Sequence, residues 1–237
     1  MKDWFYNELN HVGVDYSQKE NVNIYDEQME SFRDYEKEVE VFIEKLNPYD
    51  TYDKKVVDIG CGTGAFSISA SKYFDKIYAV DVSEEMLTTA KNKAITQKIE
   101  NISFYNSGFL NFQPKEEVDI VFSKWAFHHL PDYWKQIALL NINKMLKKDG
   151  IFFLSDVVFA FSPSIENDTN MMLNNLLNEF SKEFVEETKV HIKDEYRTYD
   201  WIIEGLIERA GFKIEKSNTK DTLESEYFCR KIKSFNT

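Results

Sequence analysis

Hydrophobic and polar positions follow two different periods along the chain, and the change between the periods predicts the elements. Short apolar runs predict strands, namely "KVVDIG", "KIYAVDV", "NISFYN", "VDIVFSK" and "GIFFLSDVVF". The segments between them, "AFSISASKYF", "SEEMLTTAKNKAI" and "YWKQIALLNINKML", have apolar residues at helical spacing. Strands that alternate with helices in this way predict an α/β fold with a doubly wound, mostly parallel sheet and helices on both faces.

Three segments depart from this alternation. Residues 26–46 predict one amphipathic helix, which Pro48 would end. The segment at about 161–199 has helical periodicity where another strand is due, so we expect a small helical lid inserted after the fifth strand, over the carboxyl edge of the sheet. A helix ended by Gly211 and the strands "KIEKSN" and "ESEYFCRKI" then bring the expected Rossmann-like sheet to seven strands.

Composition and charge narrow the class of protein. A chain of 237 residues with 43% hydrophobic residues is long enough for one well-buried domain. The net charge of −12 argues against a nucleic-acid partner, because such binding depends on clustered Lys and Arg. No apolar run has the length of a membrane span, and "MKDWFYNELN" lacks the pattern of a secretion signal. We expect a cytoplasmic protein, a monomer or homodimer, with Cys61 and Cys229 unpaired.

The segment "VVDIGCGTGAF" predicts a cofactor-binding turn between a strand and a helix. Gly60, Gly62 and Gly64 allow a tight turn whose backbone comes into contact with a ligand. Dinucleotide-binding turns follow G-x-G-x-x-G, whereas the third glycine here comes one residue early. Ala65 keeps a dinucleotide as an open alternative, and the lack of G-K-[ST] argues against a nucleoside triphosphate.

A carboxylate follows the next strand, in "YAVDVS". Asp81 is placed to accept hydrogen bonds from both hydroxyls of a ribose. The alternative is that Asp81 caps the helix that begins near Ser83, although Ser83 is itself a good cap. We favour the ribose.

Four motifs in register resemble the class I S-adenosylmethionine-dependent methyltransferases of the small-molecule type. These are the glycine turn preceded by Asp58, then "VDVSEEML", "SKWAFHHLPD" and "MLKKDGIFFLSD", over about Val56 to Asp156. The chain also resembles an uncharacterised bacterial subgroup of this family. The resemblance implies S-adenosyl-L-methionine as cofactor and in-line transfer of its methyl group to a small-molecule acceptor. Residues 1–50 would form a helical segment over the cofactor, and residues 51–237 the methyltransferase domain.

The resemblance also implies a set of cofactor-binding residues. They are Asp58, Gly60, Cys61, Gly62, Gly64, Asp81, Val82, Met86, Gly108, Phe109 and Ser123. Asp58 would face the methionine half of the cofactor, Asp81 the ribose, and Val82 and Met86 the adenine.

Gly108 departs from the family pattern. The family usually has an acidic residue after the third strand, where it reaches the adenine amino group. With Gly108 in that position, adenine recognition falls to the backbone of Phe109, or to Asn106 or Ser107.

Methyl transfer needs alignment and, for a protonated nucleophile, a base. The candidate catalytic residues are His128, His129 and Asp156, at the ends of the fourth and fifth strands, although a structural role for the histidines is about as well supported. The candidate substrate contacts are Tyr25, Lys124, His191 and Tyr196, with Glu195 nearby in the lid.

The same residues suggest three alternatives to a metal-free methyltransferase: a metal site, an oxidoreductase and a regulatory protein. Adjacent histidines diverge, and no H-E-x-x-H or cysteine pair accompanies them, so we expect no metal. A nicotinamide-dependent oxidoreductase and a non-catalytic, cofactor-binding regulatory protein remain alternatives to a methyltransferase.

Overall fold

The computed structural model describes residues 3–9, 19–30, 33–46, 51–160, 162–220 and 224–235. Three residues used in the sequence predictions lie outside this set: Phe32 in the predicted N-terminal helix, Pro48 at its end, and Phe161 at the expected start of the lid.

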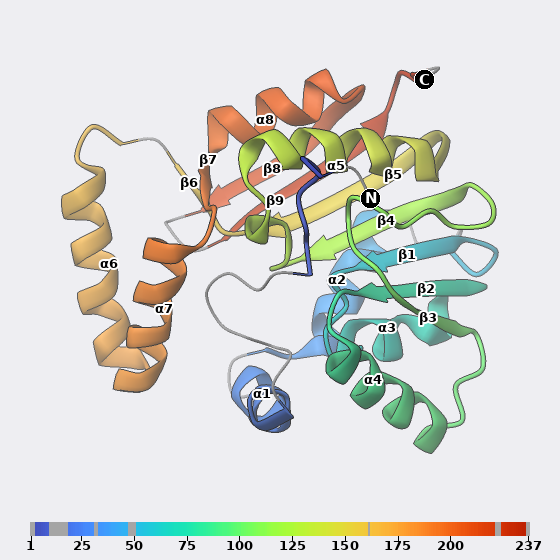
Figure 1. Cartoon of the computed structure of the whole chain (residues 1–237), viewed down its shortest axis with the longest axis horizontal. Coiled ribbons are helices and arrows are strands. Elements are labelled where there is room, and N and C mark those ends of the chain that lie inside the picture. Colours follow the sequence, from blue (N-terminus) through green and yellow to red (C-terminus); the bar gives the residue numbers. More distant parts are fainter. Residues whose placement is uncertain are drawn as a thin grey trace.

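A seven-stranded sheet forms the centre of the molecule (Figure 1). Its strands are β1 (Lys55–Ile59), β2 (Lys76–Asp81), β3 (Ile102–Asn106), β4 (Val118–Lys124), β5 (Leu146–Asp156), β8 (Phe212–Lys220) and β9 (Glu224–Lys231). They lie in the order β3-β2-β1-β4-β5-β9-β8, and within this sheet β9 alone runs opposite to the other six strands. The predicted doubly wound, mostly parallel sheet is confirmed. Strand β5 begins at Leu146, earlier than the predicted Gly150, because Leu146 pairs with Val118 of β4.

Helices cover both faces of the sheet. Helices α5 (Asp132–Met145) and α8 (Asp200–Arg209) lie on one face, and α2 (Tyr35–Leu46) and α3 (Ala65–Ala70) on the other, with α4 (Glu84–Thr96) after β2 (Figure 1). Successive strand residues point to opposite faces, so Val56 packs with the α2 and α3 side and Val57 with the α5 and α8 side. Both side chains are buried, which explains why these strands are continuous apolar runs.

The N-terminal part differs from the single helix predicted over residues 26–46. The structure has α1 (Lys19–Glu30) and, separately, α2. The Asp34 carboxylate accepts a hydrogen bond from Lys37 N at 3.0 Å, which favours a new helix start at this point. Asp26 of α1 accepts from the Thr63 hydroxyl in the glycine turn at 2.5 Å and pairs with Lys93 of α4. These contacts hold α1 against the turn that follows β1.

The inserted segment leaves the core after β5 and returns before α8. Strand β6 (Val158–Phe159) pairs in parallel with β7 (Thr198–Tyr199), and between them lie α6 (Ile165–Glu179) and α7 (Lys182–Asp194). The two helices share a small apolar core of their own, built on Met172, Leu176 and Val185. They stand on the side to which the arrowheads of the parallel strands point (Figure 1), so the insertion lies at the carboxyl edge of the sheet.

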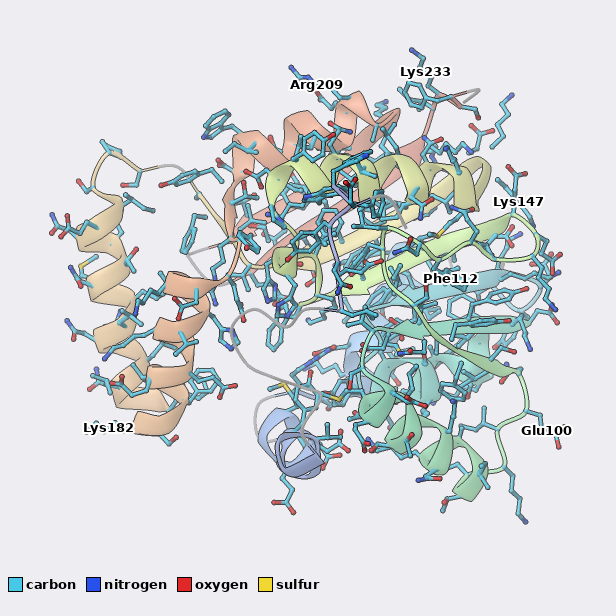
Figure 2. All side chains as sticks on the ribbon, viewed as in Figure 1. Glu100, Phe112, Lys147, Lys182, Arg209 and Lys233 are labelled. Atoms are coloured by element: carbon cyan, nitrogen blue, oxygen red, sulfur yellow. The ribbon has the colours of Figure 1, made fainter. Side chains whose placement is uncertain are left out.

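Charged side chains project from the outer surface, as Lys147, Lys182 and Arg209 do in Figure 2, whereas Phe112 is buried. Within the described ranges, no helix has the length and apolar character needed to cross a bilayer.

Candidate active site

The glycine turn after β1 has a backbone that only glycine adopts readily. Gly60 and Gly62 have φ values of 78° and 53°, in the left-handed region. A side chain on Gly60 would collide with the Ala126 Cβ, and one on Gly62 would begin 3.9 Å from the Tyr25 ring. The N–H groups of Gly60 and Cys61 donate to Val80 O of β2, at 2.8 and 3.0 Å. The turn is therefore held tightly against the end of β2.

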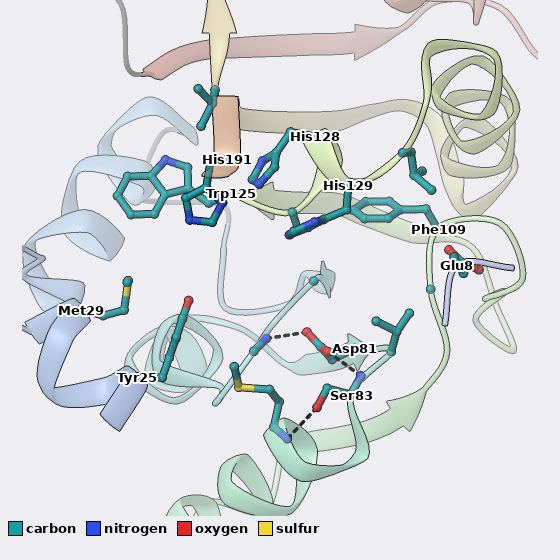
Figure 3. A pocket seen from close by; sticks show the side chains of 18 of the residues that line it. Glu8, Tyr25, Met29, Asp81, Ser83, Phe109, Trp125, His128, His129 and His191 are labelled. Atoms are coloured by element: carbon teal, nitrogen blue, oxygen red, sulfur yellow. Dashed lines mark hydrogen bonds between the residues drawn. The ribbon is translucent and has the colours of Figure 1, made fainter. Parts of the chain in front are cut away.

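Asp81, at the end of β2, connects the glycine turn to the loop before α4. Its two carboxylate oxygens accept hydrogen bonds from Gly62 N and Ser83 N, both at 2.8 Å (Figure 3). The cap of α4 is Ser83, whose hydroxyl accepts from Met86 N at 3.2 Å. Asp81 is thus not needed as the cap of that helix, and its side chain lines a cavity.

One cavity extends from this carboxylate to the end of β4 (Figure 3). At one end it is lined by Glu8, Gly60, Gly62, Asp81, Val82, Met86, Ser107, Gly108 and Phe109. At the other end it is lined by His128, His129, Phe184, Glu187, Thr188, His191 and Arg197. The second set includes residues of α7, so the lid forms one wall of the cavity.

A second, smaller cavity lies on the far side of the glycine turn and is lined by Arg33, Tyr35, Asp58, Cys61 and Lys124, among others. Tyr25 lines both cavities. Asp58 is buried and accepts a 2.6 Å hydrogen bond from the Ser67 hydroxyl. Burial raises the pKa of Asp58 to about 7, although the bond from Ser67 opposes the rise. A cation bound here would stabilise the charged carboxylate.

Cationic side chains face Asp58 across the smaller cavity. The guanidinium of Arg33 makes two bonds to the Glu38 carboxylate, at 2.9 and 2.7 Å, and lies over the Trp125 ring. Lys124 pairs with Glu224 at 2.8 Å. Trp125 has a φ of 52°, an uncommon value for a residue other than glycine, at the point where β4 enters the site.

At the other end of the main cavity, His128 lies between two buried carboxylates. Its Nδ1 is 2.5 Å from Asp156 Oδ1, and its Nε2 is 3.2 Å from Glu195 Oε2. Asp156 also accepts hydrogen bonds from the backbone N–H groups of Phe127, His128 and Val157. Burial alone would lower the pKa of His128, but Asp156 and then Glu195 raise it to about 9. Asp156, a candidate catalytic residue, therefore fixes the position of His128 and is not among the residues that line the cavity.

His129 and His191 have opposite electrostatic environments. Burial and the charge of His128 lower the pKa of His129 to about 3. His191 Nδ1 lies 2.6 Å from Glu195 Oε1, and its Nε2 lies 3.8 Å from Glu187. Burial alone would lower the pKa of His191, but these two carboxylates raise it.

Seven predicted residues are not among those that line the main cavity: Asp58, Cys61, Gly64, Ser123, Lys124, Asp156 and Tyr196. Ser123 is fully buried in β4, and Gly64 is the position before α3, where a side chain would meet Ala90. Lys124 faces the smaller cavity. Tyr196, predicted to contact substrate, has a 37% exposed side chain, and its backbone N–H donates to His128 O at 3.0 Å.

Four charged residues that line these cavities were not predicted as site residues: Glu8, Arg33, Glu187 and Arg197. Glu8 accepts hydrogen bonds from Leu110 N and the Asn111 side chain. Each of them lies outside the four recognisable motifs, in the N-terminal segment or in the inserted segment, so its position depends on how distant segments pack. The sequence offered one signal for Glu8: Gly108 has no side chain, so the space beside it is open to a side chain from another segment.

The fold and the site together define an α/β enzyme that binds a nucleotide-type cofactor, because the glycine turn and the Asp81 carboxylate meet at the carboxyl edge of a doubly wound sheet. A family model described as a methyltransferase domain matches residues 50–226. The chain belongs to this methyltransferase family, and the sequence prediction of a class I S-adenosylmethionine-dependent methyltransferase is confirmed.

Individual relatives agree with this family. An uncharacterised methyltransferase of Bacillus mycoides is 26% identical over 163 residues, which cover 67% of this chain and 69% of the relative. Among solved structures, an S-adenosylmethionine-dependent methyltransferase of Clostridium acetobutylicum has a TM-score of 0.69 at 15% identity, covering 90% of this chain and 98% of its own. The magnesium protoporphyrin IX methyltransferase of Synechocystis, solved with bound S-adenosylmethionine, has a TM-score of 0.57 at 16% identity and covers 95% and 88%. At these identities the two solved structures show a shared fold.

Proposed function

We propose that the chain transfers the methyl group of S-adenosylmethionine to a small molecule that carries an anionic oxygen. The observation that supports this most directly is the single cavity that joins the Asp81 end to the histidine end beneath α7. A cofactor bound along the glycine turn would extend toward His128 and His129, where an acceptor would meet it. The cofactor supplies an activated methyl group, so the residues of the chain mainly align the two molecules and exclude water.

The nucleoside end of the cofactor fits the residues around Asp81. The carboxylate of Asp81 lies at the cavity wall, where it would accept hydrogen bonds from the ribose hydroxyls. Val82 and Met86 line the same end, opposite Phe109, and their apolar surfaces suit the faces of an adenine ring. This assignment keeps the roles that the family resemblance implies.

Glu8 supplies a carboxylate at the place where the family usually has an acidic residue after the third strand. Its side chain lies against Gly108 and accepts a hydrogen bond from Leu110 N at 3.1 Å. Burial raises its pKa, which favours contact with a hydrogen-bond donor such as an adenine amino group. Glu8 is therefore our candidate for adenine recognition, instead of Asn106 or Ser107.

The methionine end fits the smaller cavity. An α-amino acid carries an ammonium group and a carboxylate, and this cavity has the buried Asp58 together with Arg33 and Lys124. The Asp58 carboxylate would pair with the ammonium group, and the guanidinium of Arg33 would face the carboxylate. Tyr25 stands between the two cavities, beside Gly62, where its ring would cover the cofactor.

The acceptor is inferred from the lid end of the cavity. Arg197 Nε and Nη1 are buried and have no hydrogen-bond partner among the described residues. A guanidinium in this condition is a binding group for a carboxylate, phenolate or phosphate oxygen. The wall formed by α7 favours a small acceptor over an RNA or protein chain. His129 faces the cavity beside His128, so it remains a candidate for moving a proton.

Calorimetry and a product screen test this proposal in two steps. We expect S-adenosylmethionine and S-adenosylhomocysteine to bind the whole chain, and NADH to give no thermal stabilisation. Failure of both adenosyl compounds to bind at about millimolar concentration would exclude the proposed cofactor. Small carboxylic acids and phenols, with neutral amines, RNA and protein as comparison acceptors, are then screened by mass spectrometry for a methylated product. Methylation of only RNA or protein would contradict the acceptor class, and a lack of any product would favour a regulatory role.

A further inference from the structure

Three potential metal ligands meet at the lid end of the main cavity. His128, His191 and Glu195 each offer one ligand atom, and these atoms lie within 4.8 Å of one another. His128 follows β4, whereas His191 is in the last turn of α7 and Glu195 directly follows that helix. The labelled rings of His128 and His191 lie close together in Figure 3, at the same end of the cavity. Insertion of the lid therefore brings two of the three side chains to the third.

The spacing of these atoms suits one small ion. Ligand atoms that bind a metal at about 2.0–2.2 Å lie roughly 3 Å apart in tetrahedral or octahedral geometry. The distance from His128 Nε2 to Glu195 Oε2 is 3.2 Å. The Glu195 side chain has 0% exposure, and among the described residues its Oε2 has only the His128 Nε2 contact at 3.2 Å, without a hydrogen bond of good geometry. A buried carboxylate oxygen without a donor is costly, and a bound cation would satisfy it.

The surroundings of His128 are those of a metal-binding histidine. Its Nδ1 faces the Asp156 carboxylate at 2.5 Å, and this contact leaves Nε2 directed toward Glu195. Metal-bound histidines usually donate their other ring N–H to a carboxylate in this manner. Asp156 is in turn fixed by three backbone N–H groups.

The local charge also favours a cation. The carboxylates of Asp156, Glu187 and Glu195 all face this end of the cavity or its histidines, while Arg197 interacts with Asp156 and Glu195, and Lys135 with Asp156. These two cations offset two of the three carboxylates. The alternative is that protons on the histidines alone supply the balancing charge.

We propose that His128, His191 and Glu195 bind one divalent first-row transition ion, with an open coordination position toward the cavity. Two imidazoles and one carboxylate suit Zn²⁺, Fe²⁺, Co²⁺ or Ni²⁺, whereas Mg²⁺ and Ca²⁺ prefer oxygen ligands. This departs from the sequence expectation of no metal, which considered the adjacent pair His128 and His129. Use of the open position to bind an acceptor oxygen rests on the proposed function, but binding of the ion does not.

Metal titration of the whole, chelator-treated chain tests the proposal without cofactor or acceptor. Calorimetry with Zn²⁺, and visible absorption with Co²⁺, should show one ion per chain, with much weaker binding of Mg²⁺. Glu195→Gln and His191→Ala should each weaken Co²⁺ binding by at least about tenfold. The matched control is Glu186→Gln, on the same helix, because Glu186 is exposed and pairs only with Lys189 among the described residues.

Two further measurements keep the outcomes distinct. Thermal unfolding and S-adenosylhomocysteine binding of each variant show whether it is folded. A folded wild-type chain that binds no Co²⁺, or a Glu195→Gln variant that binds it as tightly as Glu186→Gln does, would overturn the metal site. A wild-type chain that binds Co²⁺ but does not bind S-adenosylhomocysteine would instead contradict the proposed cofactor and leave the metal site standing.

Discussion

The carboxylate of Glu8 fills the space that a side chain on Gly108 would occupy. The two residues are a hundred positions apart, and the contact places an acidic group from the N-terminal segment just after β3. Gly108 has no left-handed backbone angle, so its lack of a side chain is explained by this contact and not by the conformation of the turn. We propose that this carboxylate takes the role of the acid that the family usually has after the third strand.

Replacement of Glu8 by Gln should weaken S-adenosylhomocysteine binding by about tenfold. The amide oxygen of Gln still accepts from Leu110 N, but the charge that would hold the adenine amino group is lost, which is worth about 1–2 kcal/mol. Calorimetry measures the change. The control is Asp3→Asn, which removes an exposed carboxylate from the same segment. Equal or tighter binding by the Gln variant would show that Glu8 does not contact the adenine.

Asp81→Ala should weaken cofactor binding by roughly 1–3 kcal/mol, because the ribose hydroxyls lose their acceptor. The variant also loses the bonds to Gly62 N and Ser83 N, so its stability falls as well. Asp119→Ala is a matched control, since Asp119 accepts a backbone hydrogen bond from Lys55 at the opposite edge of the sheet. Similar loss of stability with unchanged affinity is expected for that control. Unchanged affinity in Asp81→Ala would rule out the ribose contact.

Asp58→Asn should make the cofactor-free chain more stable at high pH. The pKa of Asp58 is raised from 3.8 to about 7, so the folded chain binds its proton more tightly than the unfolded chain does. The free energy of unfolding of the wild type therefore falls as pH rises from about 4 to about 7. Asn does not ionise, so at pH 8 the variant avoids the cost of a buried charge, which is on the order of 1–4 kcal/mol. Urea unfolding at several pH values measures this difference.

Ser67→Ala provides the opposite change at the same site. Its hydroxyl stabilises the charged form of Asp58, so its removal should destabilise the chain chiefly above pH 7. An Asp58→Asn variant that is less stable than wild type at pH 8 would contradict this account of the buried carboxylate. We expect the same variant to bind S-adenosylmethionine more weakly, since the ammonium group would lose its partner.

Arg197→Gln should abolish binding of small carboxylates at the lid end of the cavity and change adenosylhomocysteine affinity by less than about twofold. The guanidinium has two buried nitrogens that an oxygen anion would satisfy. A thermal-shift screen with S-adenosylhomocysteine present compares wild type, Arg197→Gln and the control Arg209→Gln, whose arginine is exposed on α8. Equal stabilisation of all three proteins by carboxylates would exclude Arg197 as the anion-binding group.

The fold followed from the sequence because each element carries its own signal. Strands such as Lys55–Ile59 are apolar runs buried on both faces, and Gly60 marks the turn that must follow. The break between α1 and α2 was missed because the amphipathic pattern continues across it, while the local cap at Asp34 decides the helix start.

The site was most predictable where its residues lie at or just after strand ends, although Tyr25 and His191 were also predicted from helices. Asp81 and His128 occupy predictable positions because the carboxyl ends of parallel strands meet at one edge of the sheet. Glu8 and Arg197 reach the same cavity from outside the motifs, and only the folded structure shows that two buried Arg197 nitrogens have no hydrogen-bond partner among the described residues. The relation of Glu195 to His128 likewise depends on where the lid docks.

Pairing of β6 with β7 means that the inserted segment begins and ends at adjacent points of the core. A segment attached in this way is exchangeable: the corresponding stretch of a relative could be grafted between Val158 and Thr198 without disturbing the register of the central sheet. Such a graft would carry its own acceptor contacts, including replacements for His191 and Glu195, while Asp81 and the glycine turn stayed in place. If the lid selects the acceptor as proposed, the part that fixes the donor and the part that selects the acceptor are separate, and chimaeras of this chain would offer a route to new methylation specificities.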